Sequence, residues 1–343
     1  MKTLLVTGGA GFIGSNFVHR MWNRYPDYRI IVLDLLTYAG SPNNLPVVPK
    51  GLDERLEFWQ GDVCNAELVD ALMRKSDTVV HFAAESHVTR SIFDNRTFFM
   101  TDVIGTHTIA NSVLKHRDRI ERFVHISTSE VYGTAETPLM SEEHPLKPLS
   151  PYASAKCGAD RLVWSYFRTY DIPAVIVRPF NNYGPRQHLE KVVPRFITSV
   201  LLGEDVTVHG DGGAARDFVF VEDNCSAIDA VLHAGIDKVK GETFNVGTGT
   251  DISIQQIADD IVRLMNGDPS HIRRIGNRPG QVDRHTADFS HIREALGWTP
   301  AVSWEDGLRQ TIEWYQNNKA WWESQVFMRK IPIVTSSGST ELH

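Results

Sequence analysis

The chain has 343 residues, of which 42% are hydrophobic and 22% charged, and its net charge is -7 with the 14 histidines taken as neutral. This composition predicts a soluble globular protein with one large domain or two moderate ones. The acidic balance argues against a nucleic-acid or anionic-membrane partner, and no apolar run is long enough to span a membrane. The 3 cysteines form no CxxC pair, which disfavours a disulfide framework or zinc site and favours a cytoplasmic location.

Short apolar runs alternate with longer helical patterns through the first two-thirds of the chain. The runs predict strands at 3–7, 29–34, 56–59, 78–82, 122–127 and 174–179. Because strands that alternate with helices form a parallel sheet covered on both faces, we predict an α/β fold with a Rossmann-type doubly wound parallel sheet. We assign residues 1–185 to this domain.

Beyond residue 185 the pattern loosens and predicts a smaller C-terminal α/β region. Four elements are predicted there: a helix at 192–203 ended by Gly203, strands at 218–221 and 243–247, and an amphipathic helix at 252–265. We expect the strands within 218–247 to return to the first domain, so that a substrate region, 186–330, is interleaved with it. The polar tail, 331–343, is expected to be poorly ordered.

The glycine-rich stretch TGGAGFIGS, residues 7–15, follows the first predicted strand and opens a helix. Its glycines, Gly8, Gly11 and Gly14, let the backbone approach a pyrophosphate at the helix N-terminus. Asp34 ends the next strand, where a carboxylate accepts hydrogen bonds from ribose hydroxyls and repels a 2′-phosphate, so NAD is favoured over NADP. The structural alternative is a glycine turn beside a surface acid.

A second pattern, YASAK, places Tyr152 and Lys156 four residues apart, on one face of a predicted helix. A lysine ammonium beside a phenol favours the phenolate and lowers the tyrosine pKa from about 10. Tyr152 is therefore a candidate base for a sugar or alcohol hydroxyl. The polar segment STSEVYG, 127–133, follows a predicted strand, and the carboxyl ends of parallel strands are where such a sheet binds its ligands.

These motifs, in this order, resemble the extended short-chain dehydrogenase/reductases of the NAD-dependent epimerase/dehydratase family. Within that family the chain is most similar to the nucleotide-sugar 4,6-dehydratases that act on dTDP-glucose. TGGAGFIGS and YASAK are superfamily-wide, whereas LLTYAG, AAESHV, NNYGPRQHLEKVVP and RPGQVDRH are narrower. The resemblance implies NAD as cofactor, a nucleotide-diphosphosugar substrate, and a homodimer formed by helices near 97–116 and 151–170.

The resemblance also implies a redox-neutral cycle through a 4-keto sugar. Tyr152 would take the C4 hydroxyl proton, while Lys156 holds Tyr152 and the nicotinamide ribose. Thr128 would support the C4 oxygen, and Glu130 would remove the C5 proton before water leaves from C6. Ser129, between them, completes the predicted catalytic set.

By the same resemblance, two groups of binding residues are expected, and no metal ligands. The cofactor residues are Gly8, Gly11, Phe12, Ile13, Gly14, Asp34, Asp62, Val63, Ala83, Ala84, Ser127, Tyr152, Lys156 and Asn181. The substrate residues are Ser86, His87, Thr128, Asn182, Arg186, Lys191, Arg216 and Arg284.

Ser129 separates this chain from the Thr-Asp-Glu pattern of dTDP-glucose dehydratases, in which the aspartate protonates the leaving C6 hydroxyl. Thr-Ser-Glu also resembles the pattern of GDP-mannose 4,6-dehydratases and of UDP-glucuronate decarboxylases. If this chain were a decarboxylase, Arg186 or Arg284 would bind the substrate carboxylate. We predict an NAD-dependent 4,6-dehydratase of a dTDP- or UDP-glucose type substrate, with UDP-glucuronate decarboxylation or 4-epimerisation as alternatives. A non-catalytic NAD-binding protein is disfavoured because the acid–base residues are all present.

Overall fold

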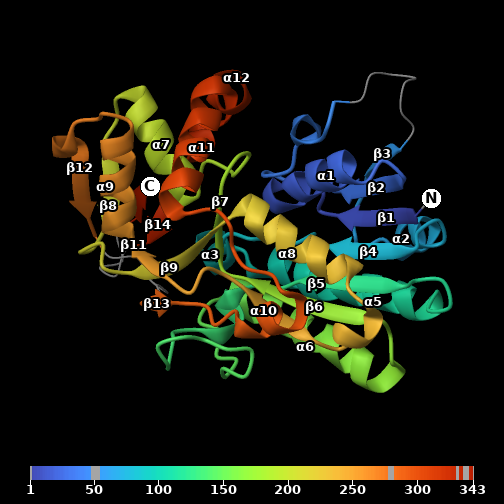
Figure 1. Ribbon diagram of the computed structural model, residues 1–343. Helices are drawn as coiled ribbons and strands as arrows, with labels where there is room; N and C mark the ends of the chain where they lie inside the picture. Colours follow the sequence, from blue (N-terminus) through green and yellow to red (C-terminus); the bar gives the residue numbers. More distant parts are fainter. Residues whose placement is uncertain (1, 48–54, 277–281, 330–331, 335–339, 343) are drawn as a thin grey trace.

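A seven-stranded parallel sheet is the centre of the computed structural model, which describes residues 2–47, 55–276, 282–329, 332–334 and 340–342. The strand order is β10-β6-β5-β4-β1-β2-β3 (Figure 1). The strands are β1 (Lys2–Thr7), β2 (Tyr28–Asp34), β3 (Leu56–Gln60), β4 (Thr78–His81), β5 (Arg122–Ile126), β6 (Ala174–Pro179) and β10 (Thr243–Val246). Every neighbouring pair is parallel, so the predicted fold class is confirmed.

Helices cover both faces of this sheet. On one face lie α1 (Phe12–Arg24), α8 (Val221–His233) and α10 (Ser290–Leu296), and on the other α2 (Ala66–Met73), α5 (Thr106–Lys115) and α6 (Pro151–Tyr170). Within β1, Leu4 and Val6 join the core under α1 and α8, whereas Leu5 joins the core under α2 and α5. Successive side chains of a strand point to opposite faces, and both faces are buried. The strands are therefore nearly continuous apolar runs in the sequence.

The strand order reverses between β1 and β4, and this reversal opens a crevice at the carboxyl edge of the sheet. The turns that follow the two strands touch there. A Cβ on Gly8 would lie 2.5 Å from the backbone nitrogen of Ala83, and the φ of Gly8 is +68°. The fold itself therefore requires glycine at this position.

A smaller region of strands and helices is built mainly from the second half of the chain. Strand β9 (Ala215–Phe220) pairs with β7 (Asn181–Tyr183), β11 (Asp251–Ser253) and β13 (Arg284–His285), and β8 (Val206–His209) pairs with β12 (Ile272–Ile275). Helices α7 (Val192–Leu202), α9 (Ile254–Leu264) and α11 (Trp304–Asn317) share a separate apolar core with these strands. Figure 1 shows this region on the side away from β1, β2 and β3.

Only one of the two strands expected to return to the large sheet does so. Strand β10 pairs with β6 in that sheet, whereas β9 lies in the smaller sheet. The reason is aromatic packing, since Phe218 and Phe220 lie against Tyr183, with ring centroids 6.3 and 5.5 Å away. Val221, predicted to end this strand, instead begins α8, which covers the large sheet.

The end of the chain contains a strand pair that its polar sequence did not predict. β14 (Pro332–Val334) pairs antiparallel with β15 (Thr340–Leu342), so the expectation of a poorly ordered tail is wrong for these residues. The pairing supplies hydrogen-bond partners to their backbone groups. The other residues of the predicted tail, 331, 335–339 and 343, lie outside the described residues, as does 278–281 of the RPGQVDRH segment.

Short helices complete the structure. They are η1 (Pro42–Asn44), α3 (Val88–Phe93), α4 (Asn95–Phe98), η2 (Phe99–Gly105), η3 (Ser129–Tyr132), η4 (Ile236–Lys238), η5 (Pro269–His271), α12 (Lys319–Trp322) and η6 (Glu323–Arg329). The η2 segment is a π-helix between α4 and α5, and π-helical turns are frequent at functional sites.

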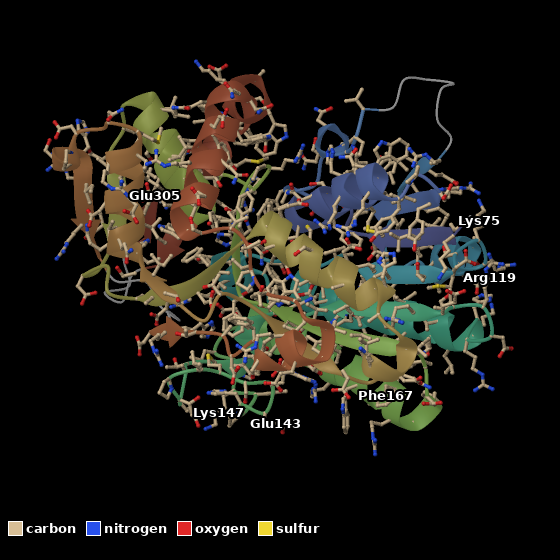
Figure 2. The ribbon with its side chains drawn as sticks, in the orientation of Figure 1. Lys75, Arg119, Glu143, Lys147, Phe167 and Glu305 are labelled. Atoms are coloured by element: carbon tan, nitrogen blue, oxygen red, sulfur yellow. The ribbon has the colours of Figure 1, made fainter. Side chains whose placement is uncertain are left out.

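Charged side chains cover the outside of both regions. Figure 2 shows Lys75 and Arg119 near one end of the molecule and Glu305 near the other. Exposed ion pairs such as Arg119–Asp77 contribute about 0–1 kcal/mol each, so they do not determine the fold. In the part of the chain that the structure describes, no helix is long and apolar enough to cross a bilayer.

Candidate active site

Two adjoining cavities collect most of the predicted site residues. Cavity 1, of about 340 Å³, lies in the crevice of the large sheet, and its predicted residues are Gly8, Gly11, Phe12, Ile13, Gly14, Asp34, Asp62, Val63, Ala83, Ala84, Ser86, Ser127, Thr128, Ser129, Glu130, Tyr152, Lys156, Asn181, Asn182 and Lys191. Cavity 2, of about 230 Å³, shares Glu130, Asn181, Asn182 and Lys191 with it and adds His87 and Arg216. Among the described residues, no cluster of His, Cys, Asp and Glu could hold a metal ion.

Two predicted substrate residues lie outside both cavities. Arg186 donates a hydrogen bond to Asn16 Oδ1 at 3.1 Å and lies over the ring of Trp314. Arg284 donates to the carbonyl oxygens of Thr137 and Pro138, both at 2.9 Å. This corrects the expectation for both residues, because their guanidinium groups hold neighbouring segments together instead of facing a ligand.

In the glycine-rich turn, one glycine is required by packing within the fold, and another leaves space that a ligand can occupy. A Cβ on Gly14 would lie 2.2 Å from the Gly8 carbonyl oxygen, so the turn leaves no room for one. A Cβ on Gly11 would approach only that same oxygen, at 3.4 Å, and would otherwise point into open space in cavity 1. The missing side chain of Gly11 therefore leaves a cradle at the N-terminus of α1, which fits a dinucleotide pyrophosphate.

Asp34 lies at the end of β2 and faces the same cavity. Its carboxylate accepts hydrogen bonds from the backbone nitrogens of Ala10 (2.9 Å) and Leu36 (2.8 Å), which fix its orientation. Burial raises the pKa of Asp34 above its usual value. Each carboxylate oxygen retains a further acceptor site, so both remain able to bind ribose hydroxyls.

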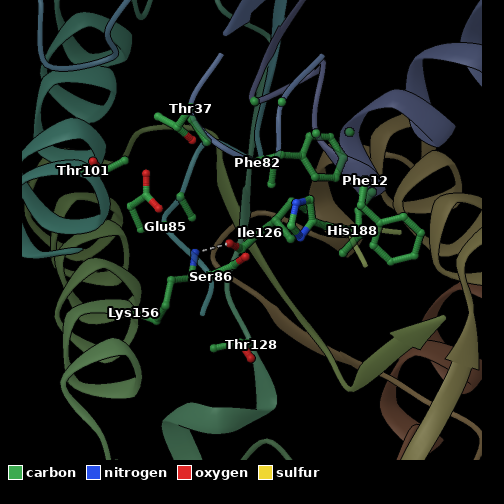
Figure 3. Close-up of a pocket in the computed structure, with 18 of the residues that line it drawn as sticks. Phe12, Thr37, Phe82, Glu85, Ser86, Thr101, Ile126, Thr128, Lys156 and His188 are labelled. Carbon is green, nitrogen blue, oxygen red and sulfur yellow. Dashed lines mark hydrogen bonds between the residues drawn. The ribbon is translucent and has the colours of Figure 1, made fainter. Parts of the chain in front are cut away.

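Tyr152 and Lys156 project from the first turns of α6. The helix begins with Ser150, whose hydroxyl accepts from Ala153 N at 3.1 Å, and with Pro151 at its first position. Both Tyr152 and Lys156 are buried. Lys156 Nζ donates to the Ile126 carbonyl at the end of β5, at 2.7 Å (Figure 3).

The direction predicted for the Tyr152 pKa is wrong in this structure. Burial and the nearby Asp102 carboxylate raise the pKa of Tyr152 above 10, while the Thr128 hydroxyl acts in the opposite direction. The Lys156 ammonium, which was expected to lower this pKa, donates instead to the Ile126 carbonyl. Burial also lowers the pKa of Lys156.

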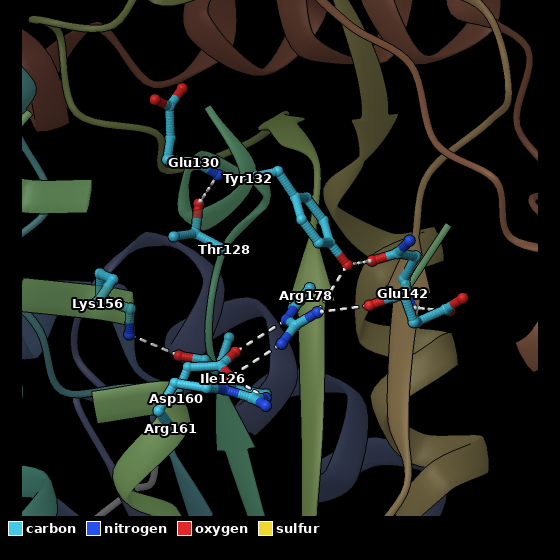
Figure 4. Close-up of polar contacts among 10 residues, drawn as sticks. Ile126, Thr128, Glu130, Tyr132, Glu142, Lys156, Asp160, Arg161 and Arg178 are labelled. Atoms are coloured by element: carbon cyan, nitrogen blue, oxygen red, sulfur yellow. Dashed lines mark hydrogen bonds and ion pairs between the residues drawn. The ribbon is translucent and has the colours of Figure 1, made fainter. Parts of the chain in front are cut away.

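Thr128 directly precedes the short helix η3, which follows β5 and carries Glu130. Thr128 caps this helix, since its Oγ1 accepts from Glu130 N at 3.2 Å (Figure 4). The Thr128 hydroxyl also lies within hydrogen-bonding reach of the Tyr152 phenol. Glu130 is about one-fifth exposed and lines both cavities. A phenol, a hydroxyl and a carboxylate therefore meet where the cavities join.

The Ser129 hydroxyl lies beside His285, whose Nδ1 is also 4.0 Å from Glu130 Oε1. Ser129 is only 2% exposed, and its Oγ lies 3.5 Å from His285 Nδ1. His285 Nε2 lies 2.5 Å from the Gly133 carbonyl, which can only accept, so Nε2 carries a proton. Burial lowers the pKa of His285, while the Glu130 carboxylate acts in the opposite direction. In a neutral ring with the proton on Nε2, Nδ1 is the atom that can accept from the Ser129 hydroxyl. Sequence reasoning missed the role of His285. This residue directly follows the RPGQVDR segment and is 156 residues from Ser129 in the chain.

A buried ionic network beneath the site was also missed. Arg178 on β6 donates to both carboxylate oxygens of Asp160 at 2.9 Å and to the Tyr132 hydroxyl at 2.9 Å (Figure 4). This network ties β6 to α6 and η3, which carry Tyr152 and Glu130. The available signal was the spacing of Asp160, which is four residues after Lys156 on the same helix.

Asp102 is a third group that sequence reasoning missed, and no sequence pattern marks it. It lies in the π-helix η2 and is 1% exposed. Its Oδ1 accepts from Glu85 N at 2.8 Å, and its Oδ2 has no hydrogen-bond partner among the described residues. Burial raises the pKa of Asp102 to about 7, opposed mainly by the charge of Lys156.

A Rossmann-type sheet with a dinucleotide cradle and an adjacent Tyr-Lys pair defines a nicotinamide-dependent short-chain dehydrogenase/reductase. The family model described as GDP-mannose 4,6 dehydratase matches residues 5–311. The chain therefore belongs to the GDP-mannose 4,6-dehydratase family.

Relatives agree with this assignment over almost the whole chain. A dTDP-glucose 4,6-dehydratase of Mycobacterium tuberculosis is 42% identical, over 93% of this chain and 95% of the relative. The low-salt glycan biosynthesis protein Agl12 of Haloferax volcanii is 43% identical, over 91% of this chain and 98% of the relative. The crystal structure of the dTDP-glucose 4,6-dehydratase DesIV from Streptomyces venezuelae, with NAD bound, is 41% identical with a TM-score of 0.88, and the match covers 94% of this chain and 99% of that one. The predicted class, an NAD-dependent sugar-nucleotide dehydratase, is confirmed, and NAD is its cofactor.

We expect Gly11→Val to weaken NAD binding without unfolding the protein. The new side chain would fill the open cradle instead of clashing with the fold. Isothermal titration with NAD, together with the thermal unfolding midpoint, measures both effects. Gly235→Val is the matched control, because a Cβ at Gly235 also meets open space but lies outside the cavities. Equal NAD affinity in the two variants would contradict the cradle.

We expect Asp102→Asn to move the ascending limb of the pH–rate profile to lower pH. The Asp102 carboxylate raises the pKa of Tyr152, so removing its charge lets the phenol lose its proton more easily. A shift of roughly half to one pH unit is expected for a single nearby charge. The pH dependence of kcat measures it, with Asp237→Asn on the exposed helix η4 as control. A shift to higher pH would contradict this role.

Proposed function

We propose that the protein catalyses the 4,6-dehydration of a dTDP- or UDP-glucose type nucleotide sugar through a 4-keto intermediate. The observation that carries this proposal is the meeting of Tyr152, Thr128 and Glu130 where cavities 1 and 2 join. Two proteins that are 42% and 41% identical to this chain are named dTDP-glucose 4,6-dehydratases, which supports the choice of nucleotide sugar.

The side chains divide the proton transfers between them. Bound NAD supplies the redox chemistry at C4 and later at C6. Tyr152, once deprotonated, takes the C4 hydroxyl proton, and the Thr128 hydroxyl orients the oxygen. The resulting ketone acidifies the C5 proton, which the Glu130 carboxylate removes.

Glu130 then returns a proton to the departing C6 hydroxyl, which leaves as water. C5 regains a proton at the end of the cycle, and the proton that Tyr152 took from the C4 hydroxyl balances it. Ser129 does not supply that proton, because its hydroxyl is directed to His285 Nδ1 and is almost fully buried. Once protonated by C5, the Glu130 carboxyl is an acid at the junction of the two cavities. Ser129 and His285 act as positioning residues for η3, so an aspartate at position 129 is not needed.

Decarboxylation of UDP-glucuronate has less support from the geometry. That reaction was expected to use Arg186 or Arg284 to bind the substrate carboxylate. Both arginines lie outside the two cavities and bond to protein groups.

Product analysis tests the proposed reaction. The purified protein is incubated separately with dTDP-glucose, UDP-glucose and UDP-glucuronate, and the product masses are read. Loss of one water from a glucose nucleotide is the expected result. Loss of carbon dioxide from UDP-glucuronate, or an epimer of unchanged mass, would replace the proposal by one of its alternatives.

We also propose a homodimer that buries an apolar face of η2 and α6. Phe99, Met100 and Ile104 on η2, and Trp164 and Tyr170 on α6, are each between 42 and 46% exposed. These helices pack against each other and together present apolar side chains outward. Light scattering of the purified protein should give twice the chain mass, and a monomer mass would contradict the proposal.

A cytoplasmic location is proposed as well. Cys64, Cys157 and Cys225 are all free, as expected for a protein kept in a reducing compartment. Fractionation of the producing cells would test this, and recovery in a secreted fraction would contradict it.

A further inference from the structure

A segment beyond the matched family region brings an arginine to cavity 2. Arg329 ends η6, whereas the family model ends at residue 311. Arg329 is 6% exposed. Its Nη2 donates to Ser199 Oγ at 2.6 Å and to Glu204 Oε2 at 3.1 Å. Its Nε and Nη1 are buried and have no hydrogen-bond partner among the described residues.

Such unpartnered donors are costly, because burial removes the water that would otherwise bond to them. Arg329 lines cavity 2, so its side chain borders the space that a ligand would fill. Nε and Nη1 are covered by protein in this structure, and a small rotation of the guanidinium group toward the cavity would bring them to an acceptor oxygen placed there. The geometry therefore points to a ligand and not only to an anchor for the end of the chain.

The charges around cavity 2 favour an anion. Lys191, Arg195 and Arg216 line it together with Arg329. The acidic residues of its lining are Glu130, at the junction with cavity 1, and Glu190, which is paired with Arg90 at 3.2 Å. The part of the cavity remote from Glu130 is therefore positively charged, as binding of a diphosphate requires.

We propose that Arg329 binds an oxyanion of the nucleoside diphosphate portion of the substrate. This inference rests on the proposed function for the identity of the substrate as a sugar nucleotide. The base carbonyls and the hydroxyl oxygens of the two sugars are the other acceptors in such a ligand. The guanidinium charge and its cationic neighbours favour the diphosphate.

Binding to the full-length, NAD-loaded protein tests the assignment. Isothermal titration is carried out with dTDP, inorganic pyrophosphate and thymidine. Arg329→Met keeps the length of the stem and removes the charge, and it should weaken dTDP and pyrophosphate binding by about 10- to 100-fold. Thymidine binding should not change. With substrate, KM should rise while kcat stays close to the wild-type value, because Arg329 lines only cavity 2, whereas Tyr152 lines cavity 1.

Two further variants separate binding from anchoring. Glu204→Gln removes the charge of the ion pair that anchors Arg329 and leaves Nε and Nη1 unchanged, so dTDP affinity should be unchanged even if the thermal midpoint falls. Arg329→Lys keeps the charge and should retain more affinity than Arg329→Met. It also gives a usable comparison if the methionine variant does not fold.

The outcomes are distinct. Wild-type dTDP affinity in Arg329→Met, a loss confined to thymidine, or no binding of any probe by the wild-type protein would each overturn the proposal. Arg329-dependent dTDP binding by a wild-type protein that turns over no glucose nucleotide would leave it standing while the proposed reaction fails.

Discussion

Replacing Glu130 with glutamine should stop the reaction after oxidation at C4. Glutamine keeps the shape of the side chain but cannot remove the C5 proton, so elimination of water has no base. General acid–base groups typically contribute about 10²- to 10⁴-fold in rate, and a loss of that size in product formation is expected. Because Tyr152 remains in place, the first step should still occur, and the absorbance of reduced nicotinamide should accumulate on mixing with dTDP-glucose. Rapid-mixing spectroscopy and product masses measure the two effects.

Glu136→Gln provides the matched control for this experiment. Glu136 lies shortly after η3, the helix that carries Glu130. Its carboxylate pairs with Lys147 on the surface and lies outside both cavities. Its glutamine variant should turn over normally. Normal product formation by Glu130→Gln would remove Glu130 from the proposed mechanism, and loss of activity without reduced nicotinamide would assign it to the first step instead.

The large sheet could be predicted because its strands are recognisable in the sequence as apolar runs. Most residues buried on the two faces are apolar, so most of the strands are short apolar runs that end where the polar active-site segments begin. The strand at 218–221 shows the limit of this reasoning. Its pattern predicts a buried strand but not the sheet that it joins, which depends on Tyr183 packing from another part of the chain.

Site residues were predictable where they follow a strand or start a helix directly. Gly11, Asp34, Glu130 and Tyr152 all have such positions, and all line cavity 1. The misplaced Arg186 and Arg284 lie in loops and short strands whose direction is determined by contacts with distant segments. For Arg284 these contacts are about one hundred and fifty positions away in the chain.

Electrostatic effects were the least predictable from spacing. A lysine four residues from a tyrosine suggests a lowered phenol pKa, but spacing within one helix says nothing about a carboxylate on another. Asp102, on the neighbouring π-helix, raises the pKa of Tyr152, and the charge of Lys156 in turn lowers the pKa of Asp102. His285 likewise explains the serine at position 129 only after the fold brings β13 beside η3.

Tyr152→Phe should block the reaction one step earlier than Glu130→Gln. Phenylalanine cannot accept the C4 hydroxyl proton, so a loss of about 10²- to 10⁴-fold in kcat is expected. In contrast to the glutamine variant, no reduced nicotinamide should accumulate. The ring packs against Phe98, with centroids 6.2 Å apart, and this contact remains, so the fold and NAD binding should be retained.

Comparing the two variants distinguishes the two catalytic steps better than either variant does alone. Both are expected to lose product formation, but only Glu130→Gln should convert bound NAD to its reduced form. Rapid-mixing absorbance separates them, and the thermal midpoint with bound NAD shows whether each protein is intact. If Tyr152→Phe also accumulated reduced nicotinamide, the C4 proton would have another acceptor, and Lys156 would be the first to examine because it lies on the same face of α6. If neither variant did so, Glu130 would be needed for oxidation at C4 itself, and the assignment of Tyr152 and Glu130 to successive steps would be wrong.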